Sequence, residues 1–443
     1  MSGGTFLEGI GGKIRPGLYI NFKAVALARI RVAERGTVIL PLIANWGQEK
    51  TFLPIEEEDD AMAKLGYDIN DPEMLAVREA YKRAKVILVY RLNQGVKASV
   101  NWGSSPIATA TAKHSGTRGN DIVIKAATNI VDTSKKDVLT YVDGMLVDEQ
   151  TAANIEDLVA NNWVSFSGTG SIPATAGTTL QGGTNGTVVN ADYTNFLDAC
   201  ETQMFDVVAY PVNDPTLKVS FSTWVKKLRD NEGKKIVGVL ADYDADYEGI
   251  INVKNGVILN DGTVLDALGA VPWVAGASAG ASIVKSLTYS AYEGAVDANP
   301  RLTNLGYNNA LLAGQFVFQF DGSKTKVEQD INSLHTYEQG KNERFSKNRV
   351  IRVLDAINND LLRTFSESYI GKIDNNEDGQ ALLTAAVDQY FLTLQAGGAI
   401  QNYVPGQDFA INKEKSVGDE VWANIAVQPV DAMEKFYFTV RVR

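Results

Sequence analysis

The sequence predicts a multidomain protein of mixed α+β class, in which layered α/β domains carry one inserted β-rich domain of sandwich or barrel type. Strand, helix and strand patterns alternate on both sides of a segment rich in Thr, Ser, Gly, Ala and Asn. That segment covers residues 97–190 and contains short strand patterns separated by turn residues. The length of 443 residues exceeds what one hydrophobic core supports, so about two to four domains are expected.

The first 20 residues are rich in glycine and predict an N-terminal arm. Phe6, Leu7 and Ile10 are the apolar side chains between the glycines, and Pro16 ends the stretch. At about 3.3 Å per residue, an extended arm of this length reaches on the order of 60 Å, far enough to touch a second subunit. A frayed terminus is the alternative interpretation.

An α/β unit follows the arm. The run TVILPLIANWG, which begins at Thr37, predicts a buried strand, and a helical pattern runs from the acidic cluster at 56–60 through Tyr81. We interpret the acidic cluster as a solvated helix start rather than a metal site. The apolar run AKVILVYRL then predicts a second strand. Strand, helix and strand in this order favour parallel pairing.

The insert and the region after it have different patterns. Inside 97–190, DIVIKAAT, DVLTYVDG and NWVSFSG predict strands, and AANIEDLVA predicts one short helix. From Tyr193 the α/β alternation resumes and predicts a partly parallel sheet. The expected elements are the helix NFLDACETQ, the strand FDVVAYPV, the helix FSTWVKKLRDNEG, the strands KIVGVLAD and GIINVKNGVIL, and a strand leading into a helix in AVPWVAGASAGAS.

The C-terminal part combines a long helix with a terminal strand. The apolar positions of 344–369 have the spacing of an amphipathic helix. Positive charges in its first half oppose the helix dipole and therefore favour a partner; they belong to Arg344, Lys347, Arg349 and Arg352. The final run KFYFTVRVR alternates strictly and predicts a strand, which either completes its own sheet or pairs with another chain. Its apolar face consists of Phe436, Phe438, Val440 and Val442.

Composition argues against several classes of protein. The formal net charge of -11 argues against a general nucleic-acid binder, which needs a basic face to displace counterions. The single cysteine, Cys200, cannot form an intrachain disulfide, which suits a reducing cytoplasm. No apolar run reaches the roughly 20 residues that span a bilayer, and the N-terminus lacks the layout of a signal peptide. We therefore expect a protein that is made and kept in the cytoplasm and is not inserted in a membrane; cell lysis would release it without any signal.

One motif favours an enzyme. GASAG, at 276–280, matches the G-x-S-x-G nucleophile elbow, with Ser278 as nucleophile and His335 as base. The carboxylates between them along the chain are Asp297, Asp321 and Asp330. A serine hydrolase is therefore the alternative function, although runs of small residues more often serve close packing.

Metal and nucleotide motifs are incomplete. DNNEDG, at 374–379, fits the first half of a calcium-binding EF-hand loop, but Ala385 stands where a bidentate Glu is required. Four Gly-Lys pairs occur, and none is followed by Ser or Thr, so the sequence has no P-loop. Two histidines and one cysteine are too few for a zinc site built on these residues. We expect no metal, no cofactor and no nucleotide hydrolysis.

Stretches spread over nearly the whole chain resemble the tail sheath family of contractile phages and related particles. None of these stretches is an enzymatic signature, but their order along one chain is specific. They are PGLYINF (16–22), HSGTRGNDI (114–122), LQGGTNG (180–186), VAGASAGASIVKSLTY (274–289), QDINSLHTY (329–337), KNRVIRVLDAINND (347–360), YIGKIDNNEDG (369–379) and QPVDAMEKFYFTV (428–440).

The resemblance implies a structural subunit that forms stacked hexameric rings around an inner tail tube and contracts when a baseplate triggers it, and it adds a tail terminator to the expected partners. It also implies that both terminal arms exchange strands with neighbouring subunits, and that the basic residues of 344–352 face an acidic tube. The domains it implies are the arm 1–20, a discontinuous tube-facing domain of 21–96 with 325–443, the insert 97–190, and an α/β domain of 191–324.

Overall fold

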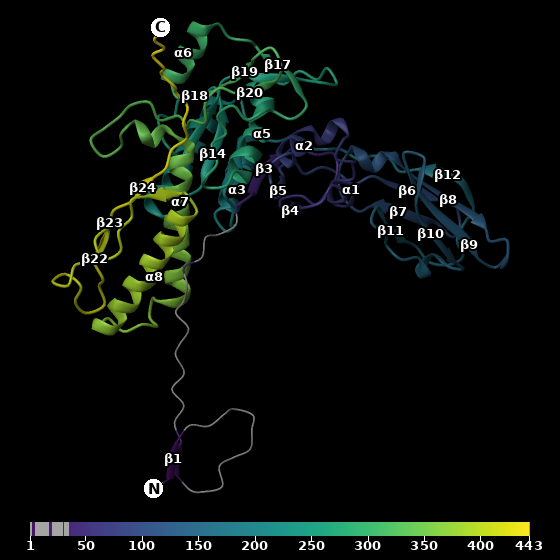
Figure 1. The fold of residues 1–443 in the computed structure, drawn as a ribbon. Helices are drawn as coiled ribbons and strands as arrows, with labels where there is room; N and C mark the ends of the chain where they lie inside the picture. The colour runs from purple at the N-terminus through teal and green to yellow at the C-terminus, as the bar shows by residue number, and fades with distance from the viewer. Residues whose placement is uncertain (1, 5–16, 20–29, 31–34, 443) are drawn as a thin grey trace. The chain divides into compact units, whose positions relative to one another are not determined.

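A computed structural model of the chain describes residues 2–4, 17–19, 30 and 35–442. The chain forms two compact units, one of 1–32 with 360–428 and a larger one of 33–359 with 429–443. Helices and several separate sheets occur together (Figure 1), which confirms the predicted mixed, multidomain class. No helix in the described part of the chain is long and apolar enough to cross a membrane.

A seven-stranded sheet forms the centre of the larger unit. Its strand order is β18-β15-β14-β13-β3-β5-β4, and all neighbouring strands pair in parallel except β4, which is antiparallel to β5. The strands are β3 (Thr37–Leu42), β4 (Phe52–Ile55), β5 (Val86–Arg91), β13 (Val207–Ala209), β14 (Val237–Ala241), β15 (Ile250–Val253) and β18 (Gln315–Phe316).

Both faces of this sheet are covered by helices, which explains why its strands are continuous apolar runs. Val38 and Leu40 of β3 belong to the core on one face, with α1, α2 and α5, whereas Ile39 belongs to the core on the other face, with α3 and α4. Cys200 is buried in this second core. The helices are α1 (Asp59–Leu65), α2 (Leu75–Tyr81), α3 (Asn190–Cys200), α4 (Pro215–Lys226) and α5 (Ala267–Gly280), with short turns of other helix types at Pro72–Met74 and Lys227–Asn231.

The sheet joins segments that the sequence assigned to different domains. Strand β13 pairs with β14 on one side and with β3 on the other. Residues 37–91 therefore share one sheet with strands from residues 207–316. Periodicity shows that each strand is buried, but it does not show which strand pairs with which across an intervening insert.

Two elements of this unit differ from their predictions. GIINVKNGVIL divides into β15 and β16 (Gly256–Leu259), in different sheets, because the Asn255 side chain bonds the backbone of Phe318 and of Pro300 and turns the chain. AVPWVAGASAGAS contains no strand, and all but its last two residues lie in α5, whose N-cap Asp266 accepts a hydrogen bond from the Gly269 amide. Helix α5 is buried on nearly all sides, so it lacks the apolar stripe that indicates a helix.

The insert consists of two antiparallel sheets that share one core. Trp46, which precedes the insert in the chain, packs into this core. The predicted helix AANIEDLVA is wrong: β10 extends through Ala152, and only the turn Ile155–Asp157 is helical. One sheet contains β10 (Met145–Ala152), β9 (Lys136–Val142), β8 (Ile122–Thr128) and β12 (Thr175–Thr179), and the other β11 (Val164–Ser167), β7 (Ala108–Ala112) and β6 (Ser99–Trp102), with a short helix at Thr117–Asp121.

The remaining elements of the larger unit described next follow α5 and precede the long helix α7 in the sequence. Strand β16 pairs with β17 (Ala295–Asn299), and β19 (Phe318–Phe320) pairs with β20 (Thr325–Val327), both antiparallel. Helix α6 spans Asn304–Leu312. The predicted helix over 344–369 divides into the short turn Glu343–Ser346 and α7 (Asn348–Ser368).

The smaller unit contains the end of α7 and a second long helix, α8 (Glu377–Ala396), which the sequence reasoning missed. The missed signal is DNNEDG, because Asn376 caps α8 by accepting a hydrogen bond from the Gly379 amide at 2.8 Å. Its described strands are β1 (Ser2–Gly4), parallel to β2 (Gly17–Tyr19), β21 (Ile400–Gln401), and β22 (Phe409–Ile411), antiparallel to β23 (Ala423–Ile425), with β24 (Gln428–Pro429) at its boundary.

Candidate assembly surfaces

The C-terminal segment exposes a row of apolar side chains. Phe436, Phe438, Val440 and Val442 are 62%, 83%, 82% and 93% exposed. The Phe436 and Phe438 rings lie nearly parallel, with centroids 6.2 Å apart, as expected for alternate residues on one face. Residues 430–442 belong to no strand, so within the described chain this segment completes no sheet of its own. The N-terminal candidates Phe6, Leu7 and Ile10 lie outside the described residues.

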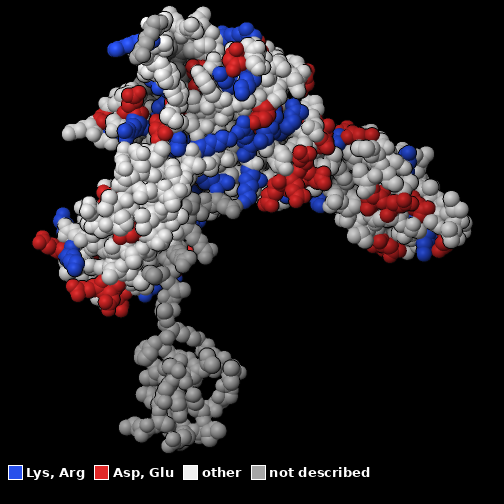
Figure 2. Space-filling model, viewed as in Figure 1, with Lys and Arg blue, Asp and Glu red and all other residues white. Residues whose placement is uncertain are grey.

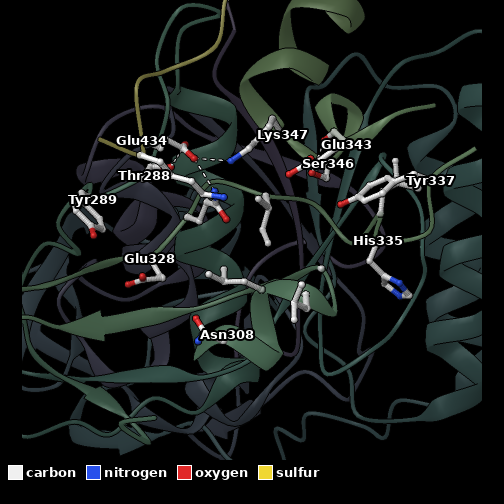
Figure 3. A pocket seen from close by; sticks show the side chains of 17 residues that line it. Thr288, Tyr289, Asn308, Glu328, His335, Tyr337, Glu343, Ser346, Lys347 and Glu434 are labelled. Atoms are coloured by element: carbon white, nitrogen blue, oxygen red, sulfur yellow. Dashed lines mark hydrogen bonds and ion pairs between the residues drawn. The ribbon is translucent and has the colours of Figure 1, made fainter. Parts of the chain in front are cut away.

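Glu434 attaches this segment to the rest of the larger unit. Its carboxylate accepts hydrogen bonds from Thr288 Oγ1 at 2.6 Å, from Gln329 Nε2 at 2.7 Å and from Lys347 Nζ at 2.5 Å. Burial raises the pKa of Glu434, but these three donors outweigh burial and hold its pKa below the ordinary value. The carboxylate lies at the edge of a cavity of about 620 Å³, where Figure 3 shows it turned toward Lys347. Sequence reasoning missed this residue, because a lone Glu before an apolar run has no distinctive pattern.

The basic residues at the start of α7 do not form one exposed face. Arg352 is 1% exposed and donates to Asp330 at 2.7 Å, so its prediction as a tube-facing residue is wrong in this structure. Lys347 is bound to Glu434, and Arg349 is half-buried. Of the four residues, only Arg344 is exposed. A buried guanidinium needs a paired carboxylate, and Asp330 reaches Arg352 from a segment that the helical pattern does not include.

Charges of one sign gather in patches despite the net charge of the chain. Figure 2 shows Lys and Arg side chains in a band and Asp and Glu side chains in separate clusters on the visible face. Residues 360–428 contain ten Asp and Glu residues against four Lys and Arg residues, a formal charge of -6. Residues 435–443 carry three basic residues and no acidic one. Residues 435–443 and residues 360–428 therefore have opposite formal charge.

The smaller unit has an unpaired strand edge beside an apolar cavity. Every residue of β23 is exposed, and β23 pairs only with β22 among the described strands. A cavity of about 770 Å³ lies next to it, lined by α7, α8 and both strands. Its apolar lining includes Phe365, Leu383, Phe409, Val421 and Ile425. Such an edge is a template for an added strand.

The residues of the proposed hydrolase site are not brought together. Ser278 is 1% exposed inside α5, whereas a nucleophile elbow places its serine at a sharp turn after a strand. The His335 ring lies 3.0 Å from Asp244 and, within the described chain, makes no hydrogen bond to Ser278. The carboxylates between them bind other partners, Asp297 with Arg301, Asp321 with Lys326 and Asp330 with Arg352.

Close helix packing explains the GASAG sequence instead. A Cβ atom on Gly276 would lie 2.3 Å from the carbonyl oxygen of Ala80 in α2, and one on Gly280 would lie 1.9 Å from that of Arg83. Only glycine allows α5 to approach this segment so closely. The two glycines are therefore required where α5 packs against α2 and the residues that follow it.

Known proteins resemble this chain over its whole length. "Phage-like element PBSX protein XkdK" of Bacillus subtilis (strain 168) is 45% identical, and the alignment covers 100% of both chains. A crystal structure of a sheath tail protein from Desulfitobacterium hafniense is 46% identical, with a TM-score of 0.86 over 94% of this chain and 98% of the other. The chain belongs to the phage tail sheath family. The resemblance inferred from the sequence is thus confirmed, and the protein is a structural sheath component rather than an enzyme.

Four sheath family models match successive segments of the chain. The tail sheath protein Gp18 domain III N-terminal region matches 35–92, and the sheath β-sandwich domain matches 93–185. The sheath central domain matches 186–333, and the sheath C-terminal domain matches 340–443. The arrangement also extends to distant proteins: the contracted helical sheath of the anti-feeding prophage has the same fold, with a TM-score of 0.58 over 97% of this chain and 99% of the other at 13% identity.

Two substitutions separate the packing role of GASAG from a catalytic one. Gly276→Ala should lower the free energy of unfolding by about 1–3 kcal/mol, because its Cβ overlaps the Ala80 carbonyl. Ser278→Ala should change it by no more than about 1 kcal/mol and should remove no ester hydrolysis. Urea denaturation and a nitrophenyl ester assay measure the two effects. Reproducible ester hydrolysis that Ser278→Ala abolishes would contradict the packing interpretation.

Proposed function

We propose that this sheath subunit polymerises as stacked hexameric rings around an inner tail tube and contracts without nucleotide hydrolysis, driving the tube through a target envelope. The observation that carries this proposal is the C-terminal segment, whose apolar side chains are exposed and complete no sheet in the described chain. A strand that pairs with a neighbouring subunit links subunits through main-chain hydrogen bonds, so domains reorient while the links persist. The energy for contraction is then stored in the assembly itself.

The acceptor for this segment is the β23 edge of a neighbouring subunit. The edge lies in a part of the chain with a formal charge of -6, and the segment 435–443 has a formal charge of +3. Opposite charge favours encounter between the two. The side chains of Phe436 and Phe438 are apolar, as is much of the lining of the cavity of about 770 Å³ beside β23. Main-chain hydrogen bonds to β23 provide most of the binding free energy. Binding of the aromatic side chains in the cavity fixes the register of the added strand.

The N-terminal arm and the tube contact complete the proposed assembly. Residues 1–20 form the second exchanged arm, through Phe6, Leu7 and Ile10. The tube-facing part contains the C-terminal domain, and the exposed Arg344 is its best-placed basic residue toward an acidic tube. An exposed ion pair contributes about 0–1 kcal/mol, which suits a contact that must break on contraction. The β-rich insert is peripheral, and baseplate and tail terminator contact the two ends of the stack.

Electron microscopy of the chain co-expressed with its tube and baseplate tests this function. We expect striated sheaths with six-fold rings around a tube, assembled in the bacterial cytoplasm, and shorter, wider sheaths after mild denaturant treatment. Contraction should proceed equally with and without ATP. Monomers that never assemble with any tube, or contraction that requires a nucleotide, would count against the proposal.

A further inference from the structure

We infer that Glu434 and Lys347 form an anchor that sets the direction in which the C-terminal arm, residues 435–443, leaves the subunit. The inference rests on the proposed function of this arm as an exchanged strand. Glu434 binds three side chains, one each from the segments around Thr288, Gln329 and Lys347. Within the described part of the chain, it is therefore the last residue whose side chain makes several hydrogen bonds to the rest of the larger unit.

Burial changes abruptly at this residue. The Glu434 side chain is 11% exposed and that of Lys347 is 14% exposed. Met433, on one side of it, is 85% exposed, and Tyr437, on the other side, is 88% exposed. The chain is thus held at a single carboxylate between exposed neighbours. Hydrogen bonds between charged groups are the stronger ones in proteins, so the Lys347 contact is the main restraint.

Further hydrogen bonds fix the position of Thr288, which donates to Glu434. Thr288 Oγ1 accepts a hydrogen bond from the Asp330 amide at 3.0 Å while it donates to Glu434. The buried Asp330 carboxylate in turn accepts from the Leu287 amide at 2.9 Å, from Asn348 at 2.9 Å and from Arg352 at 2.7 Å. The anchor is therefore connected through Thr288 and Asp330 to the start of α7. Figure 3 shows Thr288, Lys347 and Glu434 grouped around the Glu434 carboxylate.

This arrangement has a consequence for assembly. If the residue at the start of the arm were not fixed, the arm would adopt many orientations. Most of these orientations would not bring it to the β23 edge of the neighbouring subunit. Because an ion pair and two further hydrogen bonds fix Glu434, the arm is restricted to a small range of orientations. This restriction removes part of the conformational entropy that the arm would otherwise lose on association. The same contacts carry tension from the arm into α7 when neighbouring subunits move.

Distance measurements between spin labels test the anchor in the isolated subunit. Labels at Val440→Cys and Leu305→Cys report the direction of the arm, because both positions are exposed and Cys200 is buried. Glu434→Gln and Lys347→Met should each widen the distance distribution at least two-fold. The double variant should widen it no further, because the two side chains act through each other. Lys435→Met is the matched control, an exposed lysine next to the anchor, and should leave the width unchanged.

Sheath assembly is the second measurement, and it separates the anchor from the arm. Glu434→Gln should reduce the yield of sheath at least ten-fold, while deletion of 436–443 should abolish it. Unchanged distance distributions in both anchor variants would overturn the anchor, even if the deletion still abolishes sheath. Widened distributions with normal sheath yield would overturn its role in assembly. Normal assembly of the deleted chain would instead overturn the proposed function of the arm.

Discussion

A chain that lacks residues 436–443 should remain folded and form no sheath. The deleted side chains are 62% to 93% exposed at the apolar positions, so their loss should change the free energy of unfolding by no more than about 0.5 kcal/mol. The same residues supply the strand that links neighbouring subunits, so assembly should fall below detection. Thermal melting and electron microscopy measure the two properties separately.

Smaller changes identify which face of the arm is required. Phe438→Ser with Val440→Ser should prevent assembly, whereas Thr439→Ser with Arg441→Ser, on the opposite face, should reduce it only modestly. A chain without residues 1–20 should also fail to assemble. If deletion of 436–443 lowers the melting temperature strongly, the segment belongs to the core of its own subunit and the arm assignment is wrong.

The acceptor edge can be blocked without touching the arm. Asn412 donates to the Trp422 carbonyl and Ala426 donates to the Asp408 carbonyl, so by alternation the amides of Ala423 and Ile425 point away from β22. Ala423→Pro removes one of these free donors and should reduce assembly as strongly as loss of the arm, because proline on an edge strand prevents pairing. Ala423→Ser is the matched control and should assemble normally. Normal assembly of the proline variant would exclude β23 as the acceptor.

Asp355→Ala should be among the most destabilising substitutions in the chain. Asp355 of α7 receives two hydrogen bonds from Arg229, each at 2.8 Å, and both side chains are at most 5% exposed. Burial lowers the pKa of Arg229, but the facing Asp355 carboxylate outweighs burial and raises it. Removing the carboxylate leaves a buried charge without its partner, which costs about 3–5 kcal/mol. Hydrogen exchange at the amides of β14, beside this pair in the larger unit, measures the loss.

A double substitution distinguishes the unpaired charge from a simple loss of packing. Arg229→Met with Asp355→Leu removes both charges and keeps most of the volume, so the free energy of unfolding should return to within about 1 kcal/mol of the native chain. Asp297→Ala, which breaks the exposed pair with Arg301, should leave the exchange rates unchanged. If Asp355→Ala behaves like Asp297→Ala, the buried pair does not stabilise the start of α7.

Local patterns predicted much of this protein because they report which face of an element is buried. The run TVILPLIANWG predicted β3, and the spacing of apolar residues after Lys347 predicted α7. The order of several stretches predicted the sheath family, whereas the strand predicted from the alternation of KFYFTVRVR is absent from the subunit, in which 430–442 belong to no strand. These inferences need only neighbouring residues, since a period of 2 or 3.6 residues is a local property.

Tertiary structure alone decided how distant segments meet. Arg352 follows the helical pattern as a surface charge, yet Asp330 pairs with it in the core. GASAG satisfies a catalytic pattern, yet its glycines are required by the close approach of Ala80 and Arg83. The sheet unites residues on both sides of the insert, and Glu434 acquires its role from three segments that precede it by 87 to 146 residues. Each outcome depends on long-range contacts, whose free energy is gained only when the chain closes large loops, and such contacts have no period that a sequence displays.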